Sequence, residues 1–286
     1  MLPDDALLEV SNRYREDQLY LLTWLWETLV HVYHRWRRIV FASPGHLHLL
    51  HACNGNTRTK SSLLIWPPLP LAITCFPWHA ENKNGVENIT AALGCNHRVS
   101  EITIDGIKGL VLKRLAAAMQ VRFPALAYLR LSSPKPTTLV LPDTFLGGWT
   151  PRLRSFTLLE IHFPAFPQLA SSANHILSLC LWDIPDAGYI SPVRMAACLA
   201  ALPYLEAPAI GFLTFRSRLV QTNPPLPTPI LLPSLTYFVF RGHRGYLEDL
   251  RARVDIPLSI SSSLSYYDSY CKVDCAAALV RAALLS

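Results

Sequence analysis

Charged residues are scarce in this chain and make up 16% of its 286 residues, against about 25% in an average soluble protein. Glycine is also scarce, with 12 dispersed copies, so a glycine-rich loop that could cradle a phosphate is not expected. The chain lacks a nucleophile elbow, a Walker phosphate loop, an HExxH metalloprotease motif and a dinucleotide-binding fingerprint. We therefore predict a protein that is not an enzyme, with no catalytic residues and no cofactor.

Apolar residues are abundant instead. They form 51% of the chain, which is enough for a large core and argues against a chain that is disordered throughout. Ser61–Ala80 and Leu219–Phe240 are uncharged and long enough to cross a bilayer, but they hold four and five prolines, which a lipid-exposed helix does not tolerate. The amino terminus is acidic, unlike a secretory signal. The prediction is an intracellular protein, cytoplasmic or nuclear, without a membrane partner.

Basic residues and cysteines are both scattered. The formal net charge is +6, but nucleic-acid-binding proteins usually concentrate their basic residues, so no nucleic-acid partner is predicted. Seven cysteines without a CxxC pair favour small buried hydrophobes over disulfides or zinc ligands. The sharpest metal candidate, His46, His48, His51 and Cys53, matches no standard zinc spacing and alternates with leucines. That alternation predicts a strand or turn with exposed histidines, and no metal site.

An internal repeat gives the clearest structural signal. The pattern apolar-x-x-apolar-x-apolar recurs six times, with separations of 27, 27, 23, 29 and 30 residues between the first positions. Leucine-rich repeats have periods of about 20–29 residues and a strand written LxxLxL. In the fifth copy Pro208 replaces the second apolar residue. The copies begin at Val99, Leu126, Leu153, Ile176, Leu205 and Leu235.

Each copy of the pattern predicts a short strand that buries alternate side chains. Parallel strands need crossover connections, and two intervening stretches, Lys108–Gln120 and Tyr246–Val254, carry apolar residues on one helical face. A further helix is predicted over Val193–Leu202 from the residues that precede it. Ser191 and Pro192 have the sequence of an N-cap followed by proline at the first helical position. The predicted fold class is therefore α/β, a repeat solenoid with a parallel sheet.

The amino-terminal segment carries the functional hint. Residues 2–10 read LPDDALLEV, and residues 26–44 read WETLVHVYHRWRRIVFASP. The first piece begins with proline and acidic residues, which suit a helix start. In the second, Leu29, Val32, Tyr33 and Trp36 fall on one helical face with arginines on the other.

These two pieces resemble an F-box, written LPxxxLLxV and then LVxVxxxWR near a closing Ser-Pro, and the chain is similar to fungal-type F-box proteins with a leucine-rich-repeat-like carboxy-terminal region. The resemblance implies a helical F-box-like module over 1–45 and an irregular leucine-rich-repeat-like domain over 46–286, although the tail 271–286 does not look like the family. It also implies a substrate receptor of an SCF-type ubiquitin ligase. Such a receptor docks on a Skp-type adaptor held by a cullin scaffold and selects a protein for ubiquitin-dependent degradation.

The resemblance further implies an adaptor-facing set of apolar residues, although packing inside the helical module is the competing explanation for each of them. The alternative function is a free-standing leucine-rich-repeat scaffold for protein interactions, without a ligase role, in which the amino-terminal helices act only as a cap. Binding to the adaptor distinguishes the two functions. The adaptor-facing residues are Leu2, Pro3, Leu7, Leu8, Val10, Leu29, Val30, Val32, Trp36 and Ile39.

A target-binding surface is predicted between the buried strand positions, which would place its residues on one face of the parallel sheet. The set is mostly neutral, with one acid and one base, and suits a protein better than DNA. Tyr128 and Arg130 are the best anchor candidates, because Tyr and Arg are enriched at interface hot spots; equally, Tyr128 could pack against a neighbouring strand. The set is Glu101, Thr103, Tyr128, Arg130, Ser155, Thr157, Ser178, Cys180, Tyr237 and Val239.

Overall fold

The computed structural model describes residues 50–56, 63, 69–81, 83–134, 139–213, 229–256 and 263–266, together with the single helical positions His34 and Arg38. The predicted module over 1–45 therefore lies outside the described residues apart from those two positions, and so does the tail 271–286. Within the part of the chain that the structure describes, no helix has the length and apolar content needed to span a bilayer.

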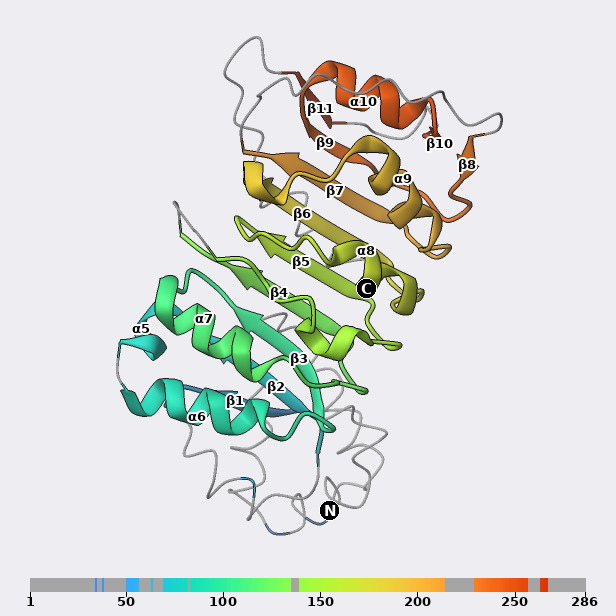
Figure 1. Ribbon diagram of the computed structural model, residues 1–286. Helices are drawn as coiled ribbons and strands as arrows, with labels where there is room; N and C mark the ends of the chain where they lie inside the picture. Colours follow the sequence, from blue (N-terminus) through green and yellow to red (C-terminus); the bar gives the residue numbers. More distant parts are fainter. Residues whose placement is uncertain are drawn as a thin grey trace.

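A nine-stranded sheet dominates the structure, and all of its strand pairs are parallel (Figure 1). The order of its strands across the sheet follows their order in the chain. A mixed α/β fold with a large parallel sheet is thus confirmed. The strands are β1 (His51–Asn54), β2 (Leu71–Cys75), β3 (Val99–Ile104), β4 (Tyr128–Ser132), β5 (Ser155–Leu159), β6 (Ser178–Ile184), β7 (Ala207–Phe212), β9 (Val239–Gly242) and β11 (Ser263–Tyr266), with β8 (Ile230–Leu231) and β10 (Val254–Asp255) in a separate small sheet.

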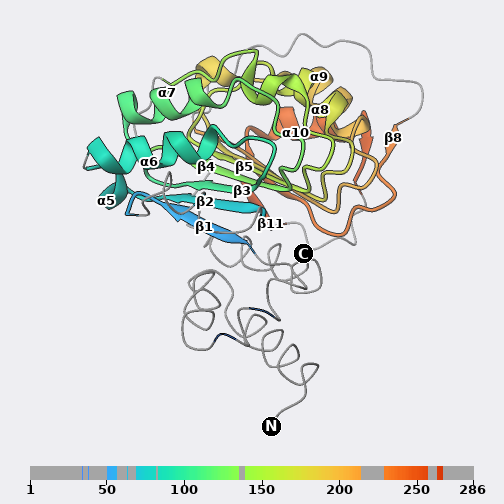
Figure 2. The same ribbon diagram turned by 90° about the horizontal axis from the view of Figure 1, so that it is seen from below.

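Helices α6 to α10, which lie in the connections, cover one face of the sheet (Figure 2). We call the opposite face of the large sheet the far face. A parallel strand pair needs such a crossover, because the chain must return to the same end of the sheet before the next strand begins. The helices are α5 (Pro77–Ala80), α6 (Lys83–Leu93), α7 (Gly109–Ala118), α8 (Phe166–Ser172), α9 (Pro192–Ala200) and α10 (Arg244–Arg251), with short 3-10 turns η1 (Phe145–Gly148) and η2 (Asp186–Gly188).

The strand register agrees with the repeat pattern of the sequence. The third apolar residues of five successive copies are direct partners across β3 to β7, and all five are buried. Pro208 lies opposite Leu179 and is buried within β7, so the proline of the fifth copy does not interrupt the strand. The alternation of side chains along each strand therefore points the repeat residues toward the helices. The five partners are Ile104, Leu131, Leu158, Leu181 and Ile210.

Other elements differ from the sequence prediction. Strands β1 and β2 precede the first repeat copy, and helix α6 occupies a segment in which no helix was predicted. The last predicted helix is displaced: α10 ends at Arg251, and Val254 lies in β10 instead. The predicted cap is confirmed, because the Ser191 side chain accepts a hydrogen bond from the Arg194 amide at the start of α9.

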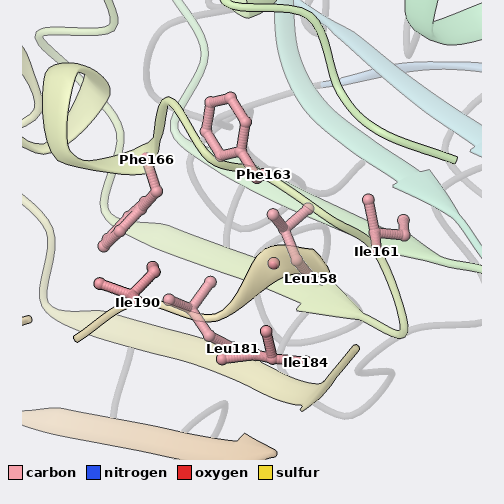
Figure 3. Close-up of a pocket in the computed structure, with 8 residues that line it drawn as sticks. Leu158, Ile161, Phe163, Phe166, Leu181, Ile184 and Ile190 are labelled. Atoms are coloured by element: carbon pink, nitrogen blue, oxygen red, sulfur yellow. The ribbon is translucent and has the colours of Figure 1, made fainter. Parts of the chain in front are cut away.

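A small cavity lies in the core between the sheet and the helices, lined by apolar residues of β5, β6 and the segments that cover them (Figure 3). Its volume is about 10 Å³, room for a single water molecule at most. It adjoins the shortest repeat interval, 23 residues, where the connection holds only the seven-residue α8. The cavity is a packing defect rather than a ligand site. Its lining residues are Leu158, Ile161, Phe163, Phe166, Leu181, Ile184, Gly188 and Ile190.

The described cysteines are mostly buried, as expected for small hydrophobes: Cys53, Cys75, Cys180 and Cys198 are buried, and Cys95 is half-buried. Burial raises the pKa of Cys75 and of Cys198 to about 11. The prediction of exposed histidines is wrong for His51, which is buried in β1. Because His51 pairs with the core residue Leu71, its side chain points to the helix side of the sheet rather than to solvent.

Candidate functional site

The far face carries the predicted target-binding residues in two aligned rows. In the first row Glu101, Tyr128, Ser155 and Ser178 are successive partners across β3 to β6. Tyr237 precedes β9, but its amide donates to the Glu206 carbonyl at 3.0 Å. The Ala207 amide donates to the Leu177 carbonyl at 3.1 Å in the same way. Tyr237 therefore holds the same position before β9 that Ala207 holds in β7, and it continues the row. All five predicted side chains are half-buried.

The second row is less accessible than predicted. Thr103, Arg130, Thr157 and Cys180 are successive partners, and Ala209 connects Cys180 to Val239. Only 4%, 4% and 6% of the surfaces of Thr157, Cys180 and Val239 are exposed. As the structure stands, these three side chains offer little surface to a partner, and the accessible part of the predicted surface lies mainly in the first row. Burial of a strand's second face depends on the rest of the chain, which the strand pattern does not reveal.

A third row, one step further along the strands, was not predicted. Its members directly follow the last apolar residue of each repeat copy, so the alternation of side chains continues for one more position. Extending the period-two pattern by one residue beyond the motif would have found them. Across β4 to β6, Ser132, Leu159 and Trp182 are direct partners, and Gly211 pairs with Arg241 between β7 and β9. The third row is Asp105, Ser132, Leu159, Trp182, Gly211 and Arg241.

At one end of the third row Asp105 organises a polar cluster. Its carboxylate lies 3.7 Å from the Arg130 guanidinium and accepts a hydrogen bond from the Ser132 hydroxyl. The Ser132 oxygen in turn accepts from the Gly106 amide at 2.8 Å. The positive charge of Arg130 therefore has an ordered counter-charge beside it. Burial raises the pKa of Glu101, in the neighbouring row, so this carboxyl ionises less readily than an exposed glutamate.

At the other end Trp182 forms an aromatic platform. A Cβ atom on Gly211 would lie 2.7 Å from Cε3 of Trp182, so the indole ring crosses β7 where only glycine leaves room. The Arg241 guanidinium lies 5.9 Å from the ring centroid and 2.8 Å from the Asp183 carboxylate. Asp183 has a φ of +53° and sits where the register between β6 and β7 shifts, a β-bulge that re-aims its side chain.

Replacing Gly211 with alanine should displace the Trp182 ring and lower the free energy of unfolding by about 1–3 kcal/mol, the usual cost of overpacking. Urea unfolding followed by tryptophan fluorescence measures the change. A double-mutant cycle supplies the control: in a Trp182→Ala background, Gly211→Ala should cost little, because no ring remains to clash. Equal costs in the two backgrounds would show that the glycine serves another purpose.

Chemically, the far face presents hydroxyls, aromatic rings and paired charges. Among the residues that the structure describes, no three or more His, Cys, Asp or Glu side chains gather closely enough to hold a metal ion. Of the metal candidate series, His51 and Cys53 lie in β1, and His46 and His48 lie outside the described residues. The ten residues predicted to face an adaptor, from Leu2 to Ile39, also lie outside them.

Comparison with known proteins adds no relative to this picture. No protein-family model matches the chain, and neither a curated protein nor a solved structure matches it.

Proposed function

We propose that this chain is the substrate-receptor subunit of an SCF-type ubiquitin ligase. In this proposal the F-box-like module over 1–45 docks on a Skp-type adaptor held by a cullin, and the repeat region binds the protein to be ubiquitinated. Binding of the target by the repeat region is supported by the far face. Its three aligned rows bring Tyr128, Arg130, Trp182 and Arg241 onto one side of a single sheet. Docking on the adaptor is supported by the F-box-like sequence of residues 2–44.

The strand order supports reading the domain as an irregular leucine-rich-repeat solenoid. Each strand of the large sheet lies beside the strands of that sheet that come before and after it in the chain. Helices α6 to α10 lie on the same side of the sheet (Figure 1). Repeats that contact only their neighbours build extended surfaces of this kind, which solenoid proteins use for binding. The far face would then be the inner surface of the solenoid.

The charges of the far face favour a protein as the bound target. Arg130 lies beside Asp105, and Arg241 beside Asp183, so each base of the third-row clusters has an acid within 4 Å. Nucleic acid would require several uncompensated Lys or Arg side chains facing the phosphates. Tyr, Trp and Arg are instead the residues that dominate binding energy in protein interfaces.

The variant Tyr128→Ala with Arg130→Glu tests the proposal. In fungal cells, affinity purification of the tagged full chain followed by quantitative mass spectrometry should recover adaptor, cullin and a target protein. We expect the double variant to reduce target recovery by at least about tenfold, since it removes both anchors, while adaptor recovery stays unchanged. A matched control, Leu110→Ala with Lys113→Glu, makes the same charge change at exposed positions of α7 and should leave both recoveries unchanged.

Two results would overturn parts of the proposal. Equal loss of the target in both double variants would remove the far face as the binding surface. Recovery of a target with no adaptor or cullin would favour the alternative, a free-standing leucine-rich-repeat scaffold without a ligase role.

A further inference from the structure

A row of basic and aromatic side chains lies at the edge of the sheet where the strands begin, which we call the amino edge (Figure 1). The turns that lead into β4 to β7 place side chains there at repeated positions. Arg122 and Trp149 stand four residues before the first apolar residue of their repeat copies, and Arg152, His175 and Tyr204 stand one residue before it. Successive strands of a sheet lie about 4.8 Å apart, so equivalent positions form a continuous row.

The row is built from stacked basic and aromatic side chains. The Arg122 guanidinium lies 5.6 Å from the centroid of the Trp149 ring, within the range of a cation–π contact. The His175 and Tyr204 rings are stacked, with centroids 5.7 Å apart and an angle of 8° between their planes. Trp149 is 40% exposed and Tyr204 is 51% exposed. These aromatic surfaces face solvent at the amino edge rather than the core.

Positive charge gathers on the same edge without compensation. Arg122, Arg152 and Arg154 are all exposed, and within the described part of the chain no carboxylate lies within 4.0 Å of them. Four other described guanidinium groups, those of Arg130, Arg241, Arg244 and Arg253, do have a carboxylate within 4.0 Å. The amino edge thus differs in kind from the balanced far face.

The turns that hold these arginines are fixed by hydrogen bonds and close packing. The Asn96 side-chain amide donates to the Arg122 carbonyl at 2.7 Å, and Gly147, at φ +62°, leaves no room for a Cβ beside the Arg122 backbone. The Arg154 amide donates to the Ala127 carbonyl at 2.8 Å. A rigid backbone loses little conformational entropy when a ligand binds, which favours affinity.

We propose that the amino edge binds an extended, acidic segment of a partner protein through a strip formed by Arg122, Trp149, Arg152, Arg154, His175 and Tyr204. Carboxylates make short, charge-assisted and often bidentate hydrogen bonds to guanidinium groups, and apolar side chains between them would pack on the indole and phenol rings. Nucleic acid fits less well, because a nucleic-acid site usually gathers a larger basic cluster than the three arginines of this strip. The proposal does not depend on the ligase role or on the far face.

A labelled peptide in which pairs of glutamates alternate with single tyrosines is the probe, titrated with the full chain and followed by fluorescence anisotropy. We expect binding that weakens as salt is added and that falls at least about tenfold in the variant Arg122→Glu, Arg152→Glu, Arg154→Glu. A matched control, Lys108→Glu, Lys113→Glu, Arg114→Glu, changes the net charge equally at other exposed positions and should change the affinity by less than about twofold.

Three outcomes would overturn the proposal: no binding of the peptide, an equal loss in both triple variants, or tighter binding of single-stranded polyuridine with the same variant dependence. The first would show that the edge does not bind acidic peptides, the second would leave only general charge attraction, and the third would make the edge a nucleic-acid surface. If the charge-reversed variant unfolds, the neutral triple variant with glutamine at the three arginines gives the same comparison. The far-face variant Tyr128→Ala, Arg130→Glu should bind the peptide normally, which separates a failure here from a failure of the ligase proposal.

Discussion

Replacing Phe156 with alanine should lower the free energy of unfolding by about 3–5 kcal/mol, the range for removing a buried aromatic ring. Phe156 is fully buried in the central strand β5. Its ring stacks on the Phe166 ring with 5.7 Å between the centroids, and the centroid of the Phe163 ring lies 6.2 Å away. Because Phe163 and Phe166 already line the small cavity, loss of the ring enlarges a space that is incompletely filled. Urea unfolding of the purified chain measures the effect.

The neighbouring residue supplies the control for this experiment. Ser155 lies in the same strand but is half-buried on the far face, so Ser155→Ala should change the free energy of unfolding by no more than about 0.5 kcal/mol. A large loss of unfolding free energy for Phe156→Ala with a small one for Ser155→Ala is expected if Phe156 faces the core and Ser155 faces away from it. Similar losses at the two positions would show that the two faces of β5 are assigned incorrectly.

The variant Leu7→Asp with Leu8→Asp should abolish binding to a Skp-type adaptor. The F-box resemblance places both leucines in an apolar interface, and a carboxylate buried there without a partner is strongly unfavourable. Co-precipitation of the adaptor with the tagged full chain measures the loss. The control is Asp4→Asn with Asp5→Asn, which alters polar positions of the same segment outside the predicted interface. Unchanged co-precipitation by the leucine variant would refute adaptor docking through this segment.

The repeat region could be predicted from the sequence because its signal is local. A strand that buries every second residue writes that period into the chain, and five copies placed their third apolar residues in one buried line from Ile104 to Ile210. Strands β1 and β2 carry no copy of the motif and could not be found this way. The F-box prediction rests on resemblance, and its residues lie outside those that the structure describes.

The polar clusters of the far face depend on contacts that the sequence does not encode locally. Asp183 and Arg241 are 58 residues apart and meet through a register shift between two strands. Trp182 and Gly211 are complementary in shape only because β6 and β7 lie side by side. At the amino edge, the repeat spacing could have aligned Arg122 with Trp149, but the stacking itself depends on the conformation of the turns.

The most direct test of the central claim is the mass of the complex that forms when the full chain is co-expressed with a Skp-type adaptor. Size-exclusion chromatography with light scattering should give the summed mass of one chain and one adaptor, and the Leu7→Asp, Leu8→Asp variant should elute without the adaptor. If the unaltered chain also elutes folded and without the adaptor, it is not the receptor subunit of such a ligase.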